Sequence, residues 1–254
     1  MVTDVSSLSA VETKNHQRSY ANTSVQAYAR IAGVLLLLSV LTGFFGQLYV
    51  PSKLVASNDA AATANNFLVH DSLFRLGFAN YLLEAVCDVA LSLLFVVLLR
   101  PVHMHLAWLA AFFGLVSTAT FAVAKLFYFT ASMIFQSTDQ LMAFSPDQVN
   151  AIALLSLNVY GYCAELFMVF YGVASIIRGY LIVQSGYLPK LLGILLALGG
   201  FGFVMKSFTV ILAPAFSSPY FLLPMLVAML SLGSWLVIRG VHVWKWQDKA
   251  AFSE

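Results

Sequence analysis

The sequence predicts an all-α, polytopic membrane protein with six transmembrane helices. Of its 254 residues, 61% are hydrophobic and only 9% are charged, whereas about a quarter of the residues in soluble domains are charged. Six stretches each reach the length of about 20 mostly apolar residues that a spanning helix needs. Short segments with proline, glycine or charged residues separate these stretches.

The predicted spans cover residues 31–50, 73–99, 106–135, 149–177, 191–212 and 220–241. Pro101 follows the second span, where it would end a helix. Ser145-Pro146-Asp147-Gln148 predicts a capping box with proline in the first turn at the start of the fourth span. Ser218-Pro219 predicts a similar start for the sixth span. A six-helix transmembrane domain is therefore expected over residues 29–243.

The segments outside this domain are more polar. Residues 1–28 are rich in Ser, Thr and Asn, which predicts a disordered tail. A cleaved signal peptide is the alternative, but the following apolar run is long enough to span and lacks a small-residue cleavage site. Residues 244–254 form a second short tail. The segment 51–72 is too polar to insert around Asn58 to Ala64, and a short helix on the outer surface is expected there.

The basic residues predict the orientation of the chain. With the N-terminus inside, nine of the thirteen fall on the cytoplasmic side: Lys14, Arg18, Arg30, Arg100, Arg178, Lys190, Arg239, Lys245 and Lys249. Lys53 and Arg75 fall outside, and Lys125 and Lys206 lie within spans. Because cytoplasmic loops carry an excess of Lys and Arg, both termini are expected to be cytoplasmic.

Several short strings occur in a fixed order along the chain: Arg30-Ile-Ala-Gly33, Asp59-Ala-Ala-Ala-Thr63, Ser72-Leu-Phe-Arg-Leu-Gly77, Cys87-Asp88, Leu98-Leu-Arg-Pro-Val102 and Gly186-Tyr-Leu-Pro-Lys190-Leu-Leu-Gly193. Together they resemble the bacterial multi-pass proteins grouped as domain-of-unknown-function family 4386. The likeness covers most of the chain from about residue 30 to 241. It implies a multi-pass protein of the bacterial inner membrane and brings no established reaction or ligand.

Five ionisable residues lie at membrane depth: Glu84, Asp88, Lys125, Glu165 and Lys206. Each costs about 2.5–3.5 kcal/mol at the centre of a bilayer, so that the five together cost about 12–18 kcal/mol if they are uncompensated. This sum exceeds the stability of a typical protein. These side chains are therefore expected to face the interior of the bundle, where they find partners or are neutral.

The spacing of these residues suggests an internal repeat. Glu84 precedes Lys125 by 41 residues, and Glu165 precedes Lys206 by the same number. Tyr81 and Tyr162 each lie three residues before a glutamate. These coincidences predict a parallel repeat of helices 2–3 and 4–5, each with an intramembrane Glu–Lys pair. Chance similarity is the alternative.

Asp88 has no lysine in this scheme. It lies one turn from Glu84 on the same helix face, and two carboxylates so placed cannot both ionise cheaply in a low dielectric. One of them is therefore expected to hold its proton. Asn80 and Asn158, with Tyr81 and Tyr162, would extend a polar strip through the bundle. Arg75 is expected either to neutralise Asp71 or to reach toward Glu84.

Three classes of function stay open. The first is a non-catalytic membrane component with a buried Glu/Lys polar core. The second is a carrier or binder of a small molecule or of protons that uses Glu84 and Asp88. The third is a membrane-embedded enzyme acting on a lipophilic substrate with a carboxyl group as general acid. Because no nucleophile with an adjacent base is recognisable, no catalytic residue is assigned, and the non-catalytic class is favoured.

No cofactor or metal is expected. His103 and His105 have no Cys or carboxylate beside them to complete a metal site, and Gly199-Gly200-Phe-Gly202 lies inside a predicted span, where close helix packing explains it better than a dinucleotide loop. A net charge of +2, scattered along the chain, argues against nucleic acid. The expected partner is the lipid bilayer. An unidentified lipophilic or small polar ligand and a homo-oligomer both stay open.

Overall fold

The computed structural model describes residues 5–56, 59–136 and 143–251. Every regular element in these ranges is a helix, and six are long and apolar enough to cross a membrane, which confirms the predicted fold class. The first span combines α1 (Val5–Gly43), the π-helix η1 (Phe44–Tyr49) and α2 (Val50–Leu54). The other spans are α4 (Asp71–Leu99), α5 (Met104–Gln136), α6 (Pro146–Ser185), α7 (Lys190–Leu212), and η3 (Pro219–Leu222) continued by α8 (Leu223–Ile238). The shorter elements are α3 (Ala60–Val69), η2 (Pro214–Phe216) and α9 (Val243–Ala251).

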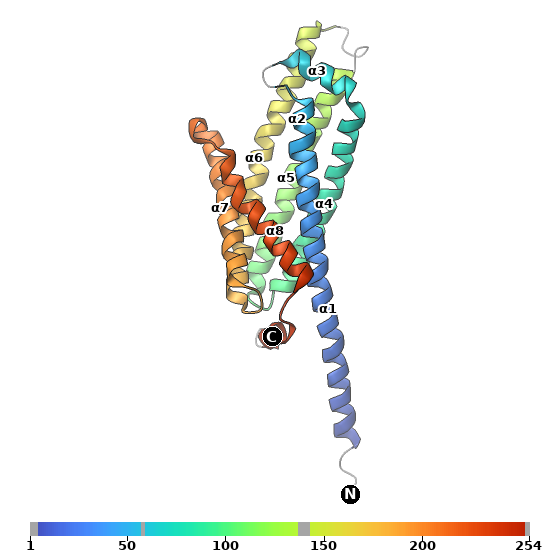
Figure 1. The fold of residues 1–254 in the computed structure, drawn as a ribbon, viewed down its shortest axis with the longest axis vertical. Helices are drawn as coiled ribbons and strands as arrows, with labels where there is room; N and C mark the ends of the chain where they lie inside the picture. The colour runs from blue at the N-terminus through green and yellow to red at the C-terminus, as the bar shows by residue number, and fades with distance from the viewer. Residues whose placement is uncertain (1–4, 57–58, 137–142, 252–254) are drawn as a thin grey trace.

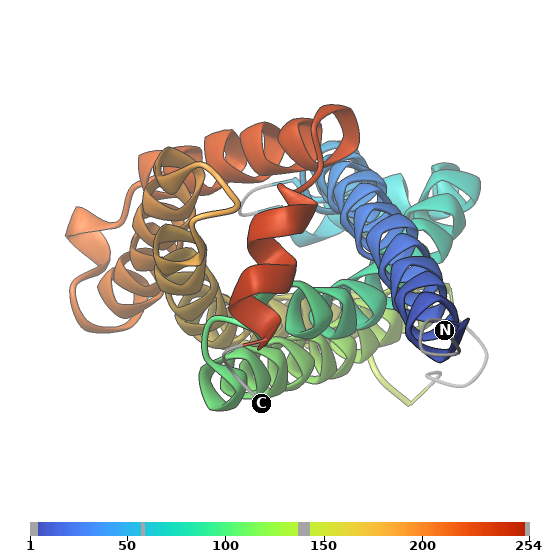
Figure 2. The same cartoon turned by 90° about the horizontal axis from the view of Figure 1, so that it is seen from below.

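The six spanning helices follow one another around a ring (Figure 1, Figure 2). From α4 to α8 each helix packs against the next, and the most extensive contacts join α5 to α6 and α6 to α7. Helix α1 packs against α4 on one side and α8 on the other. The first and last spans are therefore neighbours, and they close the ring.

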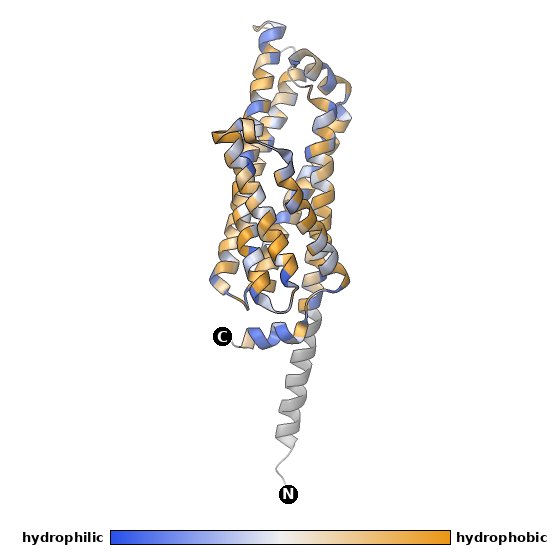
Figure 3. Ribbon diagram, turned by 60° about the vertical axis from the view of Figure 1, so that its left-hand side comes forward, coloured by the Kyte–Doolittle hydropathy of each residue, from blue (hydrophilic) through white to orange (hydrophobic). Residues whose placement is uncertain are grey.

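The outer surface of this ring is apolar. Many large hydrophobic side chains on the spanning helices are exposed, among them Leu41, Val86, Leu93 and Leu212. Figure 3 shows hydrophobic residues along the length of the bundle, whereas α9 is largely hydrophilic. This distribution suits a protein whose surrounding solvent is hydrocarbon, because spanning helices satisfy their backbone groups internally and can leave apolar side chains in contact with lipid.

The end of the bundle that is lowest in Figure 1 is held together at the carbonyl oxygen of Leu98. The Tyr187 hydroxyl donates to it at 2.7 Å and the Trp246 indole Nε1 at 3.0 Å. Burial raises the pKa of Tyr187, so that its hydroxyl keeps the proton that it donates. Through these bonds the end of α4, the α6–α7 turn and α9, which lies across this end of the ring (Figure 2), meet at one atom.

Helix α3 lies across the opposite end of the bundle (Figure 1), which confirms the short helix expected in this polar segment. Asp59 caps it by accepting a hydrogen bond from the Ala62 amide at 2.8 Å. Phe67 on α3 is fully buried, and its ring packs against the rings of Phe74 and Tyr128. These aromatic contacts attach α3 to α4 and α5.

Two helices extend beyond the limits that the sequence predicts. Helix α1 begins at Val5, in the tail for which no regular structure was expected, and no Pro or Gly interrupts the chain between there and Gly33. The domain limits near residues 28 and 244 stay predictions. Helix α6 begins at the predicted Ser145 capping box, but it ends at Ser185 rather than at residue 177. The next residue, Gly186, takes the left-handed conformation that terminates helices.

Glycines allow α6 and α7 to pack with their backbones in contact. A Cβ atom on Gly200 would lie 2.4 Å from the carbonyl oxygen of Gly172, and one on Gly193 would lie 2.5 Å from that of Gly179. Small residues at such positions are typical of close helix contacts in membranes. The packing role predicted for the glycines at 199–202 is thereby confirmed.

We expect Gly200→Ala to lower the free energy of unfolding by about 1–3 kcal/mol, since the added methyl group forces the two backbones apart. Gly161→Ala on α6 is the matched control, because a Cβ there meets nothing within 4 Å. Both changes gain the same intrinsic helix propensity, so their difference isolates the packing effect. Thermal unfolding in detergent measures it, and equal melting temperatures for the two variants would contradict this packing.

Candidate functional site

Polar side chains recur at every fourth residue along one side of α4. We call this set, which points toward α1 and α6, the α4 polar column: Asn80, Glu84, Asp88 and Ser92. Four residues make slightly more than one helical turn, so the column winds slowly around the helix. Each member hydrogen-bonds to a group on another helix.

The first span supplies three of these partners. Asn80 donates to the Thr42 carbonyl at 2.6 Å, Gln47 Nε2 donates to Glu84 Oε1 at 2.8 Å, and the Ser39 hydroxyl donates to Asp88 at 3.1 Å. Thr42 lies just before η1, and Gln47 lies within it. Single π-helical turns often occur at functional sites. Here the π-helix places Gln47 against Glu84, a contact that the sequence analysis missed.

Arg178 supplies the fourth partner, and its place is a correction to the sequence analysis. The sequence predicts a cytoplasmic position for it, because the fourth span is expected to end at residue 177. In the longer α6 it lies seven residues, or about 10 Å, before the helix end, and it is buried. Its Nη2 lies 3.3 Å from the Ser92 hydroxyl, and its guanidinium lies 5.1 Å from the centre of the Phe95 ring.

Gly114 on α5 makes the space for this guanidinium group. A Cβ atom at Gly114 would lie 2.7 Å from Arg178 Nη2 and 2.8 Å from the Ser92 hydroxyl. The Nε atom of Arg178 is buried and has no hydrogen-bond partner within the described ranges. The core therefore contains a third basic group besides Lys125 and Lys206. The hydrogen-bonding capacity of this guanidinium group is only partly satisfied by the protein.

Asp88 and Arg178 line the same small cavity between α1, α4, α5 and α6. Ser92, Thr118 and Tyr171 also border it. Its volume of about 10 Å³ is roughly what one water molecule requires. A water there would have several polar partners, which is the condition for a buried water to be stable.

Lys125 lies among aromatic rings rather than against a carboxylate. Its Nζ is 3.1 Å from the Tyr160 hydroxyl, and it lies between 4.9 and 5.4 Å from the ring centres of four residues: Tyr81, Phe121, Tyr128 and Tyr160. Cation–π attraction of this kind stabilises a desolvated ammonium group. The ion pairs among the described residues are Asp71–Arg75 and Glu165–Lys206. The predicted ion pair between Glu84 and Lys125 is therefore wrong: it is not formed among the described residues.

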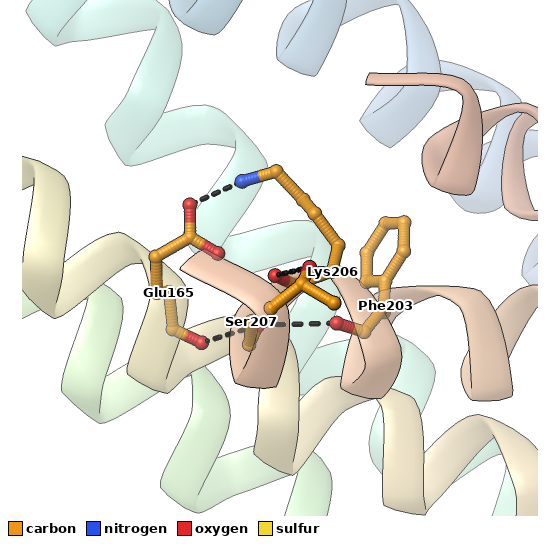
Figure 4. Close-up of polar contacts among 5 residues, drawn as sticks. Glu165, Phe203, Lys206 and Ser207 are labelled. Atoms are coloured by element: carbon orange, nitrogen blue, oxygen red, sulfur yellow. Dashed lines mark hydrogen bonds and ion pairs between the residues drawn. The ribbon is translucent and has the colours of Figure 1, made fainter. Parts of the chain in front are cut away.

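The second predicted pair is present. Lys206 Nζ binds Glu165 Oε1 between α7 and α6 (Figure 4), and both side chains are largely buried. The Ser207 hydroxyl lies 2.9 Å from the Glu165 carbonyl oxygen and 3.1 Å from that of Phe203, which ties the two helices together beside the ion pair. The Glu165–Lys206 pair thus joins two neighbouring helices of the ring.

The polar strip that the sequence predicts is only partly formed. Asn158 and Tyr162 are exposed, and Tyr160 contacts Lys125 instead. Successive helical residues are about 100° apart, so Tyr160 and Tyr162 face nearly opposite directions. Of the two Glu–Lys pairs expected from the repeat, only one is formed. Arg75 binds Asp71 at 2.7 Å, which settles the two expectations for its partner in favour of Asp71.

Five buried polar atoms of the described core have no hydrogen-bond partner: Tyr81 OH, Glu84 Oε2, Tyr128 OH, Glu165 Oε2 and Arg178 Nε. The core holds three carboxyl groups and three basic groups, but only Glu165 and Lys206 form an ion pair. Buried polar groups are normally paired, and exceptions need a physical reason such as a bound water, ion or proton.

One comparison with known proteins finds a match. A family model described as "Domain of unknown function (DUF4386)" matches residues 31–240. No curated protein sequence and no solved structure matches the chain. The matched range includes the whole α4 polar column, its partners on the first span, and Lys125, Arg178 and the Glu165–Lys206 pair.

We expect a thermodynamic coupling between Glu165 and Lys206 that is absent between Glu84 and Lys125. Glu165→Gln and Lys206→Met should each lower the free energy of unfolding. The sum of these two losses should exceed the loss in the double variant by about 1 kcal/mol or more, because the effects of changing two residues in contact are not additive. The effects of Glu84→Gln and Lys125→Met should add within about 0.5 kcal/mol.

Unfolding of the purified protein in mixed detergent micelles measures both cycles. The Glu84 and Lys125 variants are the matched control, because they remove the same chemical groups at the same spacing in the sequence. Equal coupling in the two cycles would show that Glu84 and Lys125 also form an ion pair, contrary to this structure.

Proposed function

The chain belongs to the DUF4386 family, and we propose that it is a non-catalytic multi-pass membrane protein whose buried core binds and releases protons. Glu84 and Asp88 are the carboxyl groups that exchange them. The observation that carries the proposal is that Glu84 Oε2 is buried without a partner, while Asp88, one turn away, lines a cavity with room for about one water. Protons and water are the species that such a core can accommodate.

Glu84 and Asp88 differ from Glu165 in their surroundings. Glu165 has its charge compensated by direct contact with Lys206. Glu84 Oε1 accepts from the neutral amide of Gln47, and its Oε2 has no partner. Asp88 accepts from the neutral hydroxyl of Ser39 and faces the cavity. Two carboxyl groups one turn apart, without direct ion pairs, share protons more readily than they both ionise.

The size of the cavity disfavours a small-molecule cargo and an enzyme substrate at these carboxyl groups. Pockets for small molecules usually enclose about 300 Å³ or more, whereas the cavity beside Asp88 holds about 10 Å³. A lipophilic substrate or a small-molecule cargo therefore does not fit against Asp88 in this conformation. Proton exchange requires no such space.

We place the protein in the bacterial inner membrane with both termini in the cytoplasm. The bias of Lys and Arg toward one side supports this orientation, and so does the family resemblance. The described start of α1 and helix α9 lie at the same end of the bundle (Figure 1), as an even number of crossings requires. With this orientation, α9 and the hydrogen bonds at the Leu98 carbonyl oxygen are on the cytoplasmic side, and α3 is on the outer side.

Proton exchange by Glu84 and Asp88 is tested by infrared titration of the purified protein. We expect the absorption of protonated carboxyl groups to change with pH by about one proton per chain, because the two groups titrate as a pair. Glu84→Gln and Asp88→Asn should each remove most of this change. Glu84→Gln should leave the melting temperature unchanged or raised, since the amide keeps an acceptor for Gln47 and removes a like charge.

Glu165→Gln is the control for this experiment. It removes a buried carboxyl group that is held by an ion pair, so it should lower the melting temperature and leave the pH-dependent infrared change intact. The proposal fails if the Glu84 and Asp88 variants retain the wild-type titration, or if the wild type shows no titration of a buried carboxyl group.

The orientation is tested with reporter fusions at the C-terminus in a bacterial host. A fluorescent protein that folds only in the cytoplasm should be bright, and alkaline phosphatase, which is active only outside, should be inactive. A phosphatase fused within the α3–α4 segment should be active. The reversed pattern would place both termini outside.

A further inference from the structure

We propose that the corner between α8 and α9 is a binding site for a phosphate group, carried by an anionic phospholipid or free in solution. A cavity of about 230 Å³ lies here, lined by Trp235, Arg239, Gly240, Val241 and His242. The lining residues belong to the end of α8 and to the segment that joins it to α9. The site is separate from the α4 polar column and does not depend on the proposed proton exchange.

The backbone of this corner is fixed by contacts with two other parts of the protein. Gln26 on α1 donates through Nε2 to the Arg239 carbonyl at 3.0 Å and accepts from the Val241 amide at 3.1 Å. The His242 amide donates to the Tyr187 carbonyl at 3.2 Å. Gly240 has a φ of +67°, and a Cβ there would lie 2.3 Å from the Gln26 side chain. The cavity is therefore pre-formed by the backbone.

The side chains at this corner suit an anion. Arg239 and His242 are exposed, and neither side chain has a hydrogen bond or ion pair with another described residue. Arginine binds phosphate oxygens through parallel N–H groups, and histidine supplies a further donor. Helix α9 begins directly after His242, at Val243, and the first amides of a helix have no partner within it.

The surroundings of the cavity suit the phosphate of a lipid in particular. Trp235 lines it from α8, and tryptophan is enriched where membrane proteins meet the headgroup region. Exposed Ile238, the residue before Arg239 on α8, leaves apolar surface beside it for acyl chains. Basic pockets at the ends of spanning helices are a recognised arrangement for anionic headgroups.

Native mass spectrometry of the full-length, delipidated protein in a neutral detergent tests the site. The probes are phosphatidylglycerol, diacylglycerol with the same acyl chains but no phosphate, and inorganic phosphate. We expect the wild type to bind one phosphatidylglycerol more tightly than diacylglycerol. Arg239→Gln and His242→Gln should each weaken this binding about tenfold, the effect of losing one charge-assisted hydrogen bond.

Two further variants serve as controls. Lys245→Gln removes an exposed positive charge from α9 that does not line the cavity, and it should bind like the wild type. Arg239→Lys keeps the charge and should recover part of the affinity. Because the side chains of Arg239, His242 and Lys245 are all exposed, the four variants should melt at the wild-type temperature.

The comparison of probes identifies the source of the phosphate. Tighter binding of phosphatidylglycerol than of inorganic phosphate supports a lipid site, and equal affinities support a site for free phosphate. The proposal is overturned if diacylglycerol binds as tightly as phosphatidylglycerol, or if Arg239→Gln and His242→Gln bind phosphatidylglycerol no more weakly than Lys245→Gln.

Discussion

The central constraint on this structure is that polar groups buried among membrane helices must find partners inside the protein. The α4 polar column meets this constraint by hydrogen bonds to the first span, at α1 and η1, and to α6. Because Asn80, Glu84 and Asp88 bind the first span over about two turns of α4, they set the position of that span against α4. The ring closes at α1 and α8, so the closure also depends on where the column holds α1.

The features that sequence reasoning predicted correctly have local signals. Apolar length located the six spans, and Ser145 with Gln148 located the start of α6 through a capping box that the structure contains. The cost of a charge in hydrocarbon singled out the five ionisable residues at membrane depth and predicted that their side chains need partners inside the bundle. The Glu165–Lys206 pair was predictable because two adjacent antiparallel helices bring residues at similar heights together.

The features that it did not predict depend on helix ends and on the third dimension. Arg178 was assigned to a loop because hydropathy falls at that residue, although Gly186 followed by Pro189 was a signal that the helix ends later. Nothing in the sequence marks the π-helix that aims Gln47 at Glu84. The spacing that matched Tyr81 with Tyr162 could not reveal that Tyr160 faces Lys125, because the rotation of α6 is set by its glycine contacts with α7.

The π-helix of the first span also changes the phase of that helix. A π turn takes up one residue more than an α turn, so the residues beyond it are rotated by about 100° relative to an uninterrupted helix. Before it, Gly33 packs against the backbone of Gly233 on α8, and beyond it, Val50 packs against Gly77 on α4. The first span therefore consists of two segments in a single chain, and the residue gained at η1 turns the packing face of the second segment relative to that of the first.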